Sequence, residues 1–472
     1  MANKPPHDPI EHFGRRPDDH SIWRNGPIWM ASDRRLARAV GRPIAGFLKV
    51  EAAGGIVLLI AAVAALVLAN SPWSDAYQSF LHTEVDLTVA GLHLDGDVAY
   101  WVNDALMVFF FFVVGLEIKY EIVSGELRDP RRAAVPILAA FGGMIVPALI
   151  YTAFNAGSDG ASGWGIPMAT DIAFAVGVLG LLGRRIPSPA RVFLLTLAIV
   201  DDIGAIAVIA VFYTSDLSME WLAAAGVGVL AMVALRRVRV WSMSAYALIG
   251  VFVWLATYES GVHATIAGVV IGLLTPARPL LERDVAQNYA REAMQDGVID
   301  ADELNRYRFL LGESVSVAER LERRLHPWTS YVVLPIFAFC NAGIDLRGGV
   351  LADALTSTVT AGVAVGLVAG KIIGVSTASW LAVVTGIGRL PDRTSWGMLV
   401  GLAAVAGIGF TVSLFIAGLS FEEGSVAESA AKVGILGASL VAAILGSTLL
   451  ILTTRHREPA REDAPVRDAA GS

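Results

Sequence analysis

Apolar and polar stretches alternate along this chain with a spacing that predicts membrane-spanning helices. A helix of about 20 apolar residues crosses a bilayer, although some of the runs here are shorter than that. Twelve runs can be counted, near residues 54–69, 99–116, 133–154, 164–182, 192–213, 220–235, 241–256, 262–274, 329–343, 360–384, 397–419 and 429–453. The pattern predicts an all-α integral membrane protein with about twelve transmembrane helices.

Basic residues between the runs predict the orientation of the chain. The loops between the runs fall into two sets that alternate along the chain. The first four loops of one set lack Lys and Arg altogether, at residues 71–97, 155–163, 214–219 and 257–261. The loops of the other set carry basic clusters such as Arg128, Arg131 and Arg132. The later loops of the first set hold only Arg347 and Lys432. Because cytoplasmic loops are enriched in Lys and Arg, we expect both termini to lie in the cytoplasm.

The composition agrees with a membrane protein. Of 472 residues, 55% are hydrophobic and 17% charged, with a mean hydropathy of +0.60. The net charge of −7 gives no reason to expect a nucleic-acid partner. The single cysteine, Cys340, forms no intrachain disulfide and is interpreted as a small buried residue. Residues 1–50 lack the apolar segment of a cleavable signal peptide, and we expect 1–50 and 456–472 to be disordered cytoplasmic tails.

Two adjacent aspartates, Asp201 and Asp202, lie within the apolar run 192–212. Each charge at that depth costs roughly 2.5–3.5 kcal/mol, so the default interpretation is a functional site. Neighbouring helix positions point about 100° apart. One carboxylate can therefore face an ion path while the other faces a neighbouring helix. The alternative is a polar network that only holds helices together.

Two other runs carry signs of an interrupted helix. Pro167 precedes Asp171 in the fourth run, and Gly407 and Gly409 precede Thr411 in the eleventh. Proline removes a backbone donor, and broken helices in corresponding halves mark the binding site of many transporters. The alternative for the glycine pair is close helix packing.

One basic residue, Lys371, lies well within the tenth run. We expect it to meet an internal carboxylate or the negative ends of broken helices. The alternative is a lysine that extends to the membrane interface. Left unpaired, the three acids and the lysine would cost roughly 10 kcal/mol, so pairing and partial protonation must remove most of that cost.

Buried carboxylates with nearby hydroxyls and free carbonyls suit hard cations. The same carboxylates also retain protons more strongly than they do in water. A site that either ion can occupy, and that opens alternately to each side, exchanges the two. Three rival functions remain from the residues alone: an intramembrane protease using Asp171 and Asp201, a sodium-coupled symporter, and a passive channel.

Two loops contain further elements. Residues 84–94 alternate and predict a small β-hairpin on the outer face, whose edge either pairs with another subunit or is a simple loop. The loop 279–327 is long and charged, and residues 292–303 match the second half of a calcium-binding loop but not the first. An amphipathic cytoplasmic helix is the favoured interpretation.

Several stretches resemble the bacterial NhaA-type sodium/proton antiporter family. They are ATDIAFA at 169–175, LAIVDDIGA at 197–205, SGVHAT at 260–265, GIGFT at 407–411, and NDALM at 103–107 with GLE at 115–117. The resemblance covers residues 51–455, with a cytoplasmic insertion at about 279–318. It implies two inverted repeats, formed by runs three to five and ten to twelve, in which runs four and eleven cross as discontinuous helices.

The resemblance also implies roles for the buried residues. Asp202 would be the main cation ligand and proton carrier, with Asp201 and Thr170 completing the metal ligands. Lys371 would pair with Asp201 in the absence of cation, and Asp171 would compensate the positive helix ends at the crossing. The implied function is electrogenic export of Na⁺ or Li⁺ in exchange for protons, in the bacterial inner membrane, without a cofactor.

Control by pH would reside at the cytoplasmic entrance, with Glu117, Glu121 and Glu322. His263 would belong to a pH-responsive region, although a hydrogen-bonded packing histidine is an equal alternative. The hairpin would form a homodimer contact. This chain departs from the family in its insertion, in its long N-terminal tail and in Arg323, where the best-known pattern has histidine. These departures affect the expected pH threshold and not the ion site.

Overall fold

Each of the twelve apolar runs is helical in the structure, a computed structural model that describes residues 53–85, 87–89, 92–214, 217–238, 243–279 and 301–454. Six helical segments in this part of the chain are long and apolar enough to cross a membrane, and two bent pairs bring the number to eight. An all-helical membrane protein is therefore confirmed. The predicted tails, and residues 292–300 of the partial calcium-loop pattern, lie outside the described residues.

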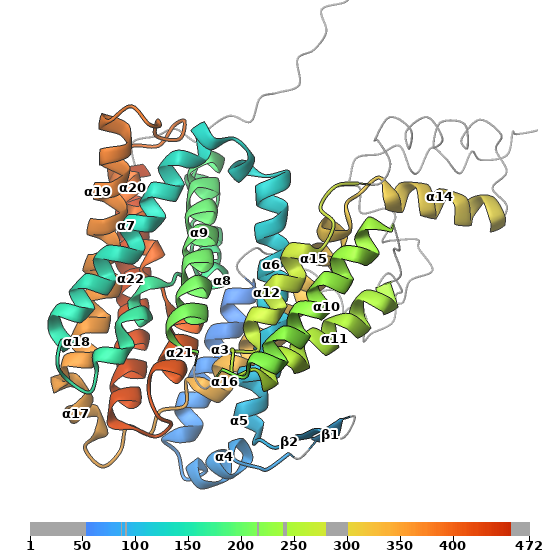
Figure 1. The fold of residues 1–472 in the computed structure, drawn as a ribbon. Coiled ribbons are helices and arrows are strands. Elements are labelled where there is room, and N and C mark those ends of the chain that lie inside the picture. Colours follow the sequence, from blue (N-terminus) through green and yellow to red (C-terminus); the bar gives the residue numbers. More distant parts are fainter. Residues whose placement is uncertain are drawn as a thin grey trace, which may run out of the picture. The chain divides into compact units, whose positions relative to one another are not determined.

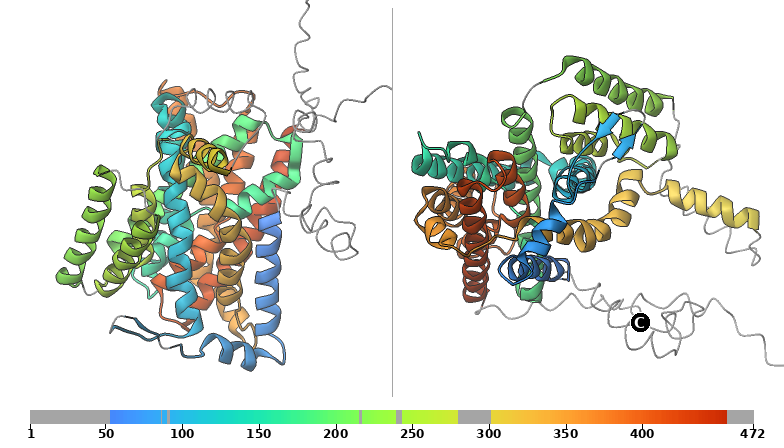
Figure 2. Two further views of the ribbon diagram at one scale, coloured as in Figure 1. Left: turned by 90° about the vertical axis from the view of Figure 1, so that its right-hand side faces the viewer. Right: turned by 90° about the horizontal axis from the view of Figure 1, so that it is seen from below.

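The helices of residues 54–454 form two groups that lie side by side (Figures 1 and 2). The first group comprises α7 (Pro130–Asn155), η6 (Ala161–Met168), α8 (Ile172–Leu182), α9 (Ser188–Phe212), α17 (Val350–Thr356), α18 (Thr358–Val365), η9 (Gly366–Gly370), α19 (Lys371–Val384), α20 (Trp396–Ala406), α21 (Phe410–Ser420) and α22 (Val426–Thr454). Within it, α7 packs along α19 and α18, and α20 packs along α22. This group holds both interrupted helices.

The second group contains most of the remaining helices. It comprises α5 (Val98–Trp101), η4 (Val102–Leu106), α6 (Met107–Val123), α10 (Met219–Arg237), α11 (Met243–Glu259), α12 (Thr265–Leu274), α15 (Val317–Trp328), η8 (Thr329–Val333) and α16 (Leu334–Asn341). α3 (Ala53–Ala69) is followed by α4 (Ser74–Leu81), which turns away from it by 116°. Two short 3-10 turns connect helices along the chain. η5 (Glu126–Arg128) lies between α6 and α7, and η7 (Gly183–Arg185) lies between α8 and α9.

Both predicted interruptions are confirmed. η6 and α8 are separated by residues 169–171, and α20 and α21 by residues 407–409, with a bend of 45°. The two breaks touch, because the backbone amide of Asp171 donates a hydrogen bond of 2.7 Å to the carbonyl of Ile408. Backbone that leaves a helix within a membrane must find such partners inside the protein. This contact brings the two irregular segments to one place.

The predicted hairpin is also present, and a helix lies in the long charged loop. β1 (Leu87–Val89) pairs antiparallel with β2 (Leu92–Leu94), with Leu87 opposite Leu94 (Figure 1). α14 (Ala301–Glu313) occupies the second half of the charged insertion and precedes α15. Figure 2 shows α14 in yellow, extending away from the other helices. Residues 280–300 lie outside the described part.

Candidate functional site

The aspartate pair lies on α9, which is continuous through both residues. Asp201 is 0% exposed and Asp202 is 4% exposed, so both carboxylates are removed from bulk solvent. Around them, α9 presents apolar side chains such as Leu197, Ala198 and Ala205. Burial of this kind is tolerated only where other groups of the protein or a bound ion compensate the charge.

Asp201 is compensated by a lysine from a distant helix. Lys371, also 0% exposed, places Nζ 2.5 Å from Asp201 Oδ2 and 3.0 Å from Thr170 Oγ1. The Thr170 hydroxyl lies 2.8 Å from Asp201 Oδ2 and 2.8 Å from the carbonyl oxygen of Ala406, and its one hydrogen can be donated to either. Ala406 ends α20, so the lysine also lies near the negative end of that helix.

A π-helical turn, η9, immediately precedes Lys371. Its first glycine, Gly366, lies against Pro167 of η6. Its last glycine, Gly370, lies against Pro147 of α7, where an added methyl group would come within 2.9 Å of the proline Cα. A π turn inserts an extra residue and rotates the helix that follows it. This local irregularity therefore contributes to the direction in which Lys371 points.

Asp202 lies beside this ion pair but has different surroundings. Within the described part of the chain, the buried oxygens Asp202 Oδ1 and Asp201 Oδ1 accept no hydrogen bond. Buried carboxylate oxygens normally have partners. Each of these two buried oxygens therefore has an unused capacity to accept a hydrogen bond or to ligate an ion. The described residues contain no cluster of three or more His, Cys, Asp or Glu side chains that could hold a metal ion.

Asp171 contacts the second segment of each interrupted helix, at the start of α8 and at the start of α21. Its Oδ1 accepts a hydrogen bond of 2.9 Å from the Phe174 amide, which caps α8. Its Oδ2 accepts bonds of 3.0 Å from the amide of Thr411 and 2.6 Å from the Thr411 hydroxyl, in the first turn of α21. One negative charge therefore faces two positive helix ends. Asp171 makes these contacts and not a shared-proton pair with Asp201, so the geometry of the protease alternative is not formed.

The acidic residues expected at the entrance lie on two neighbouring helices. Glu117 and Glu121 belong to α6, and Glu117 is close enough to Asp202 for their charges to interact. Glu121 Oε2 accepts a bond of 2.9 Å from the Glu126 amide. On α15, ahead of the apolar run, Glu322 lies near Glu121 and Glu319. Burial and the charges of these two acids raise the pKa of Glu322 above its ordinary value.

Two further expected residues lie outside this acidic group. His263 Nε2 is 2.5 Å from the carbonyl oxygen of Tyr213, between the end of α9 and the start of α12. The imidazole is therefore held by a backbone carbonyl. Arg323 pairs with Glu319 over 2.9 Å and its side chain is 77% exposed, so it does not occupy the buried region.

Some contributors were not assigned a role from the sequence. Thr411 completes the Asp171 contacts, and Ser413 donates a bond of 2.7 Å to the carbonyl of Ile166. Ser439 of α22 accepts a bond of 3.3 Å from the Phe410 amide, and thereby satisfies another donor at the start of α21. The GIGFT stretch pointed to the first of these, whereas nothing in the apolar run of α22 singles out Ser439.

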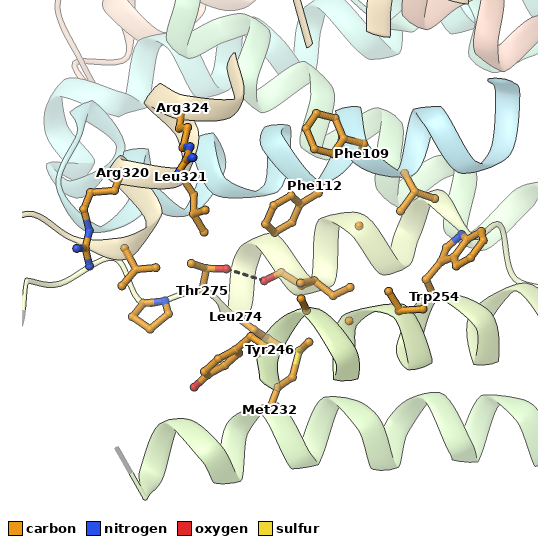
Figure 3. Close-up of a pocket in the computed structure, with 18 of the residues that line it drawn as sticks. Phe109, Phe112, Met232, Tyr246, Trp254, Leu274, Thr275, Arg320, Leu321 and Arg324 are labelled. Atoms are coloured by element: carbon orange, nitrogen blue, oxygen red, sulfur yellow. Dashed lines mark hydrogen bonds between the residues drawn. The ribbon is translucent and has the colours of Figure 1, made fainter. Parts of the chain in front are cut away.

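One cavity in the described part of the chain is not lined by the aspartates. It has a volume of about 770 Å³ and lies between α6, α11, α12 and the start of α15 (Figure 3). Its walls are mainly apolar, with Phe109, Phe112 and Trp254 along its length and Arg320 and Arg324 at one end. None of Asp201, Asp202 and Lys371 lines this cavity.

A buried carboxylate pair beside two touching helix breaks defines a secondary transporter of cations. Comparison with known proteins gives the family. The family model described as Na⁺/H⁺ antiporter 1 matches residues 45–450. The Na⁺/H⁺ antiporter NhaA of Anaeromyxobacter sp. (strain Fw109-5) is 47% identical over 436 residues, which cover 90% of this chain and 95% of that protein.

Two other relatives agree. NhaA 3 of Frankia alni is 48% identical over 406 residues, covering 86% of this chain and 87% of that protein. NhaA of Rhodopirellula baltica is 45% identical over 420 residues, which cover 87% of this chain and 94% of that protein. The chain belongs to the NhaA family of Na⁺/H⁺ antiporters. It is accordingly a multi-pass membrane transporter and not an enzyme.

Proposed function

We propose that the chain exports Na⁺ or Li⁺ in exchange for protons, with Asp202 as the main cation ligand and proton carrier. The observation that carries this assignment is the unequal environment of two adjacent carboxylates. Asp201 is bound by Lys371 and Thr170, whereas Asp202 Oδ1 accepts no hydrogen bond from the described residues. Asp202 is therefore the carboxylate available to an incoming ion.

Exchange follows from competition at these oxygens. A desolvated carboxylate is stabilised by a proton or by a cation, and it is costly when neither is bound. Na⁺ entering beside Asp202 and Thr170 must also draw on Asp201, which requires the Lys371 ammonium to move away. Protons returning from the other side reverse this step. Alternating exposure of the site then couples the two flows in opposite directions.

The wider arrangement that we propose follows from family membership. Twelve transmembrane helices would form two inverted repeats, with both termini in the cytoplasm of a bacterial cell and the transporter in the inner membrane. Glu117, Glu121, Glu322 and His263 would adjust activity to pH. The hairpin β1–β2 would join two copies of the chain, since its strands leave edges available for pairing.

The direct test uses everted membrane vesicles with a pH-sensitive dye. Dequenching on addition of Na⁺, Li⁺ or K⁺ is measured from about pH 6 to 9, where tuned carboxylates and histidines titrate. Na⁺ and Li⁺ should dissipate the proton gradient, and Asp202→Asn should abolish the response. Asp353→Asn, which changes an exposed aspartate of α17, serves as the matched control. Normal exchange by the Asp202→Asn protein would remove Asp202 from this role.

A binding measurement tests the competition itself. Na⁺ affinity of the purified protein, measured by calorimetry, should fall as the pH is lowered, because protons occupy the same oxygens. An affinity that does not change with acidity would show that cation and proton do not share a site, and would overturn the proposed mechanism.

A further inference from the structure

The ion pair between Asp201 and Lys371 joins two helices that scarcely touch. Asp201 belongs to α9 and Lys371 to the first turn of α19, and their charged atoms lie 2.5 Å apart. The helix α7 packs along both α9 and α19, which have little direct contact with each other. The separation of the two charges therefore depends on how α7 contacts each helix.

On the α19 side, the contact is made by glycines and cannot be compressed. An added methyl group at Gly142 of α7 would collide with the carbonyl oxygen of Gly374, which lies one helical turn beyond Lys371. At the neighbouring Gly143, an added methyl group would lie 3.6 Å from Lys371 Cδ and 2.9 Å from Val375 Cγ2. The backbone of α7 is thus pressed against α19, and the lysine side chain passes over Gly143.

On the α9 side, the contact is made by one long side chain. Met144, which is 4% exposed, follows Gly143 directly, and its thioether lies over Gly204 of α9. An added methyl group at Gly204 would collide with the Met144 sulfur. Gly204 is three positions after Asp201, so both residues lie on the same side of α9. The space between α7 and α9 at the level of Asp201 is filled by this thioether.

We propose that Gly142, Gly143 and Met144, here called the α7 spacer, set the separation of Asp201 and Lys371 and thereby the affinity for Na⁺. Met144 is a positioning residue that determines the distance from α7 to α9. Since Lys371 and Na⁺ compete for Asp201, a wider separation favours Na⁺ and a narrower one favours the lysine. This inference rests on the proposed function of the aspartate pair.

Gly204→Ala tests the spacer by inserting a methyl group where the thioether lies. The added methyl group meets the end of the flexible Met144 side chain, which must shift within the buried interface between α7 and α9. We expect that α9 then moves away from α7 and carries Asp201 away from Lys371. The Na⁺ concentration that gives half-maximal dequenching in everted vesicles should fall by about three- to tenfold, which corresponds to about 0.6–1.4 kcal/mol in the competition between Na⁺ and Lys371. The thermal stability of the purified protein should fall at the same time. A residue that only supports the fold would lower stability without improving cation affinity.

Two further variants give matched comparisons. Met144→Ala removes the thioether, lets α9 approach α7, and should raise the half-maximal Na⁺ concentration. Combining it with Gly204→Ala provides room for the added methyl group and should return both readings toward wild type. Gly437→Ala changes an exposed glycine of α22 where an added methyl group would meet no other group within 4 Å, and should leave both readings unchanged.

The outcomes separate this inference from the proposed function. Wild-type protein that shows no Na⁺-dependent proton movement would refute the function itself. Wild-type exchange together with an unchanged half-maximal Na⁺ concentration in both single variants would overturn the spacer alone. If Gly204→Ala does not accumulate in the membrane, the test of the α7 spacer rests on Met144→Ala. A lowered or unchanged half-maximal Na⁺ concentration in that variant would overturn the inference.

Discussion

Lys371 Nζ lies 2.5 Å from Asp201 Oδ2, and neither side chain is exposed to solvent. The adjacent Asp202 points elsewhere, because successive residues of a helix project about 100° apart. One carboxylate is therefore paired within the protein, and we propose that its neighbour binds the transported ions. Substitutions at the two sides of this arrangement should have different consequences.

Lys371→Ala should destabilise the protein strongly. Removing one partner of a buried pair leaves an uncompensated charge, at a cost of about 3–5 kcal/mol. Thermal unfolding in detergent at neutral pH measures this change. Arg323→Ala breaks the pair with Glu319 on an exposed part of α15, and should cost less than about 1 kcal/mol. Equal stability of the two variants would contradict a structural contribution from the buried pair.

Thr170→Val should weaken cation binding while preserving the shape of the side chain. The Thr170 hydroxyl contacts Asp201 and Lys371, and the replacement removes an oxygen without removing volume. We expect the half-maximal Na⁺ concentration to rise by about tenfold, the effect of losing one interaction of about 1.4 kcal/mol. Thr377→Val, on the same helix as Lys371, removes a hydroxyl that bonds only to backbone carbonyls. That control should retain wild-type kinetics.

Asp171→Ala should disturb both helix breaks at once. The carboxylate receives bonds from Phe174 and Thr411 at the starts of α8 and α21, and charge-assisted bonds are worth about 1.5–3 kcal/mol each. We expect a loss of about 2–4 kcal/mol in the free energy of unfolding together with a large loss of transport. Ser395→Ala removes the cap of a single helix, α20, and should cost about 1 kcal/mol. A similar cost for both would argue against a double role for Asp171.

Glu322→Gln should make stability less dependent on pH. The pKa of Glu322 is raised above 4.5 by burial and by Glu121 and Glu319. A raised pKa means that the folded state favours the protonated form, so this contribution is complete below about pH 4 and is lost as the pH rises. The variant should therefore lose less stability than wild type when unfolding is followed from acidic to neutral pH. Parallel curves for the two proteins would show that Glu322 titrates normally.

The same substitution should also alter transport if Glu322 acts at the entrance. At alkaline pH the wild-type carboxylate adds negative charge near Glu121, which attracts cations. The glutamine variant should need more Na⁺ for half-maximal activity at alkaline pH and should differ less from wild type at acidic pH. Glu313→Gln changes an acid of α14 that pairs with Arg320, and provides a comparison on the same surface segment.

Local sequence signals were sufficient for several parts of the fold. Proline at 167 and glycines at 407 and 409 correctly indicated the two helix breaks, because these residues disfavour helix for reasons confined to their own backbone. Alternation over residues 84–94 likewise indicated the hairpin formed by Leu87–Val89 and Leu92–Leu94. The number of membrane spans was less well predicted. About twelve were expected, whereas six to eight helical segments of the described residues are long and apolar enough to cross a membrane.

The residues of the site were also recognisable in part. A charge in an apolar run stands out because of its cost in the membrane, which is how Asp171, Asp201, Asp202 and Lys371 were found. Ser439 and Met144 gave no such signal, since a serine or methionine in an apolar helix is ordinary. Their contacts with Phe410 and Gly204 come from the packing of separate helices.

The sequence by itself determined that this chain is a helical membrane protein with interrupted spans and ionisable groups buried among apolar residues, because those features depend on local composition and on the cost of charge in lipid. Only the tertiary structure decided that Lys371 meets Asp201 and that Asp171 serves both helix starts. These contacts join residues 170 and 240 positions apart in the chain. Contacts over such separations are set by the packing of whole helices, which no local pattern specifies.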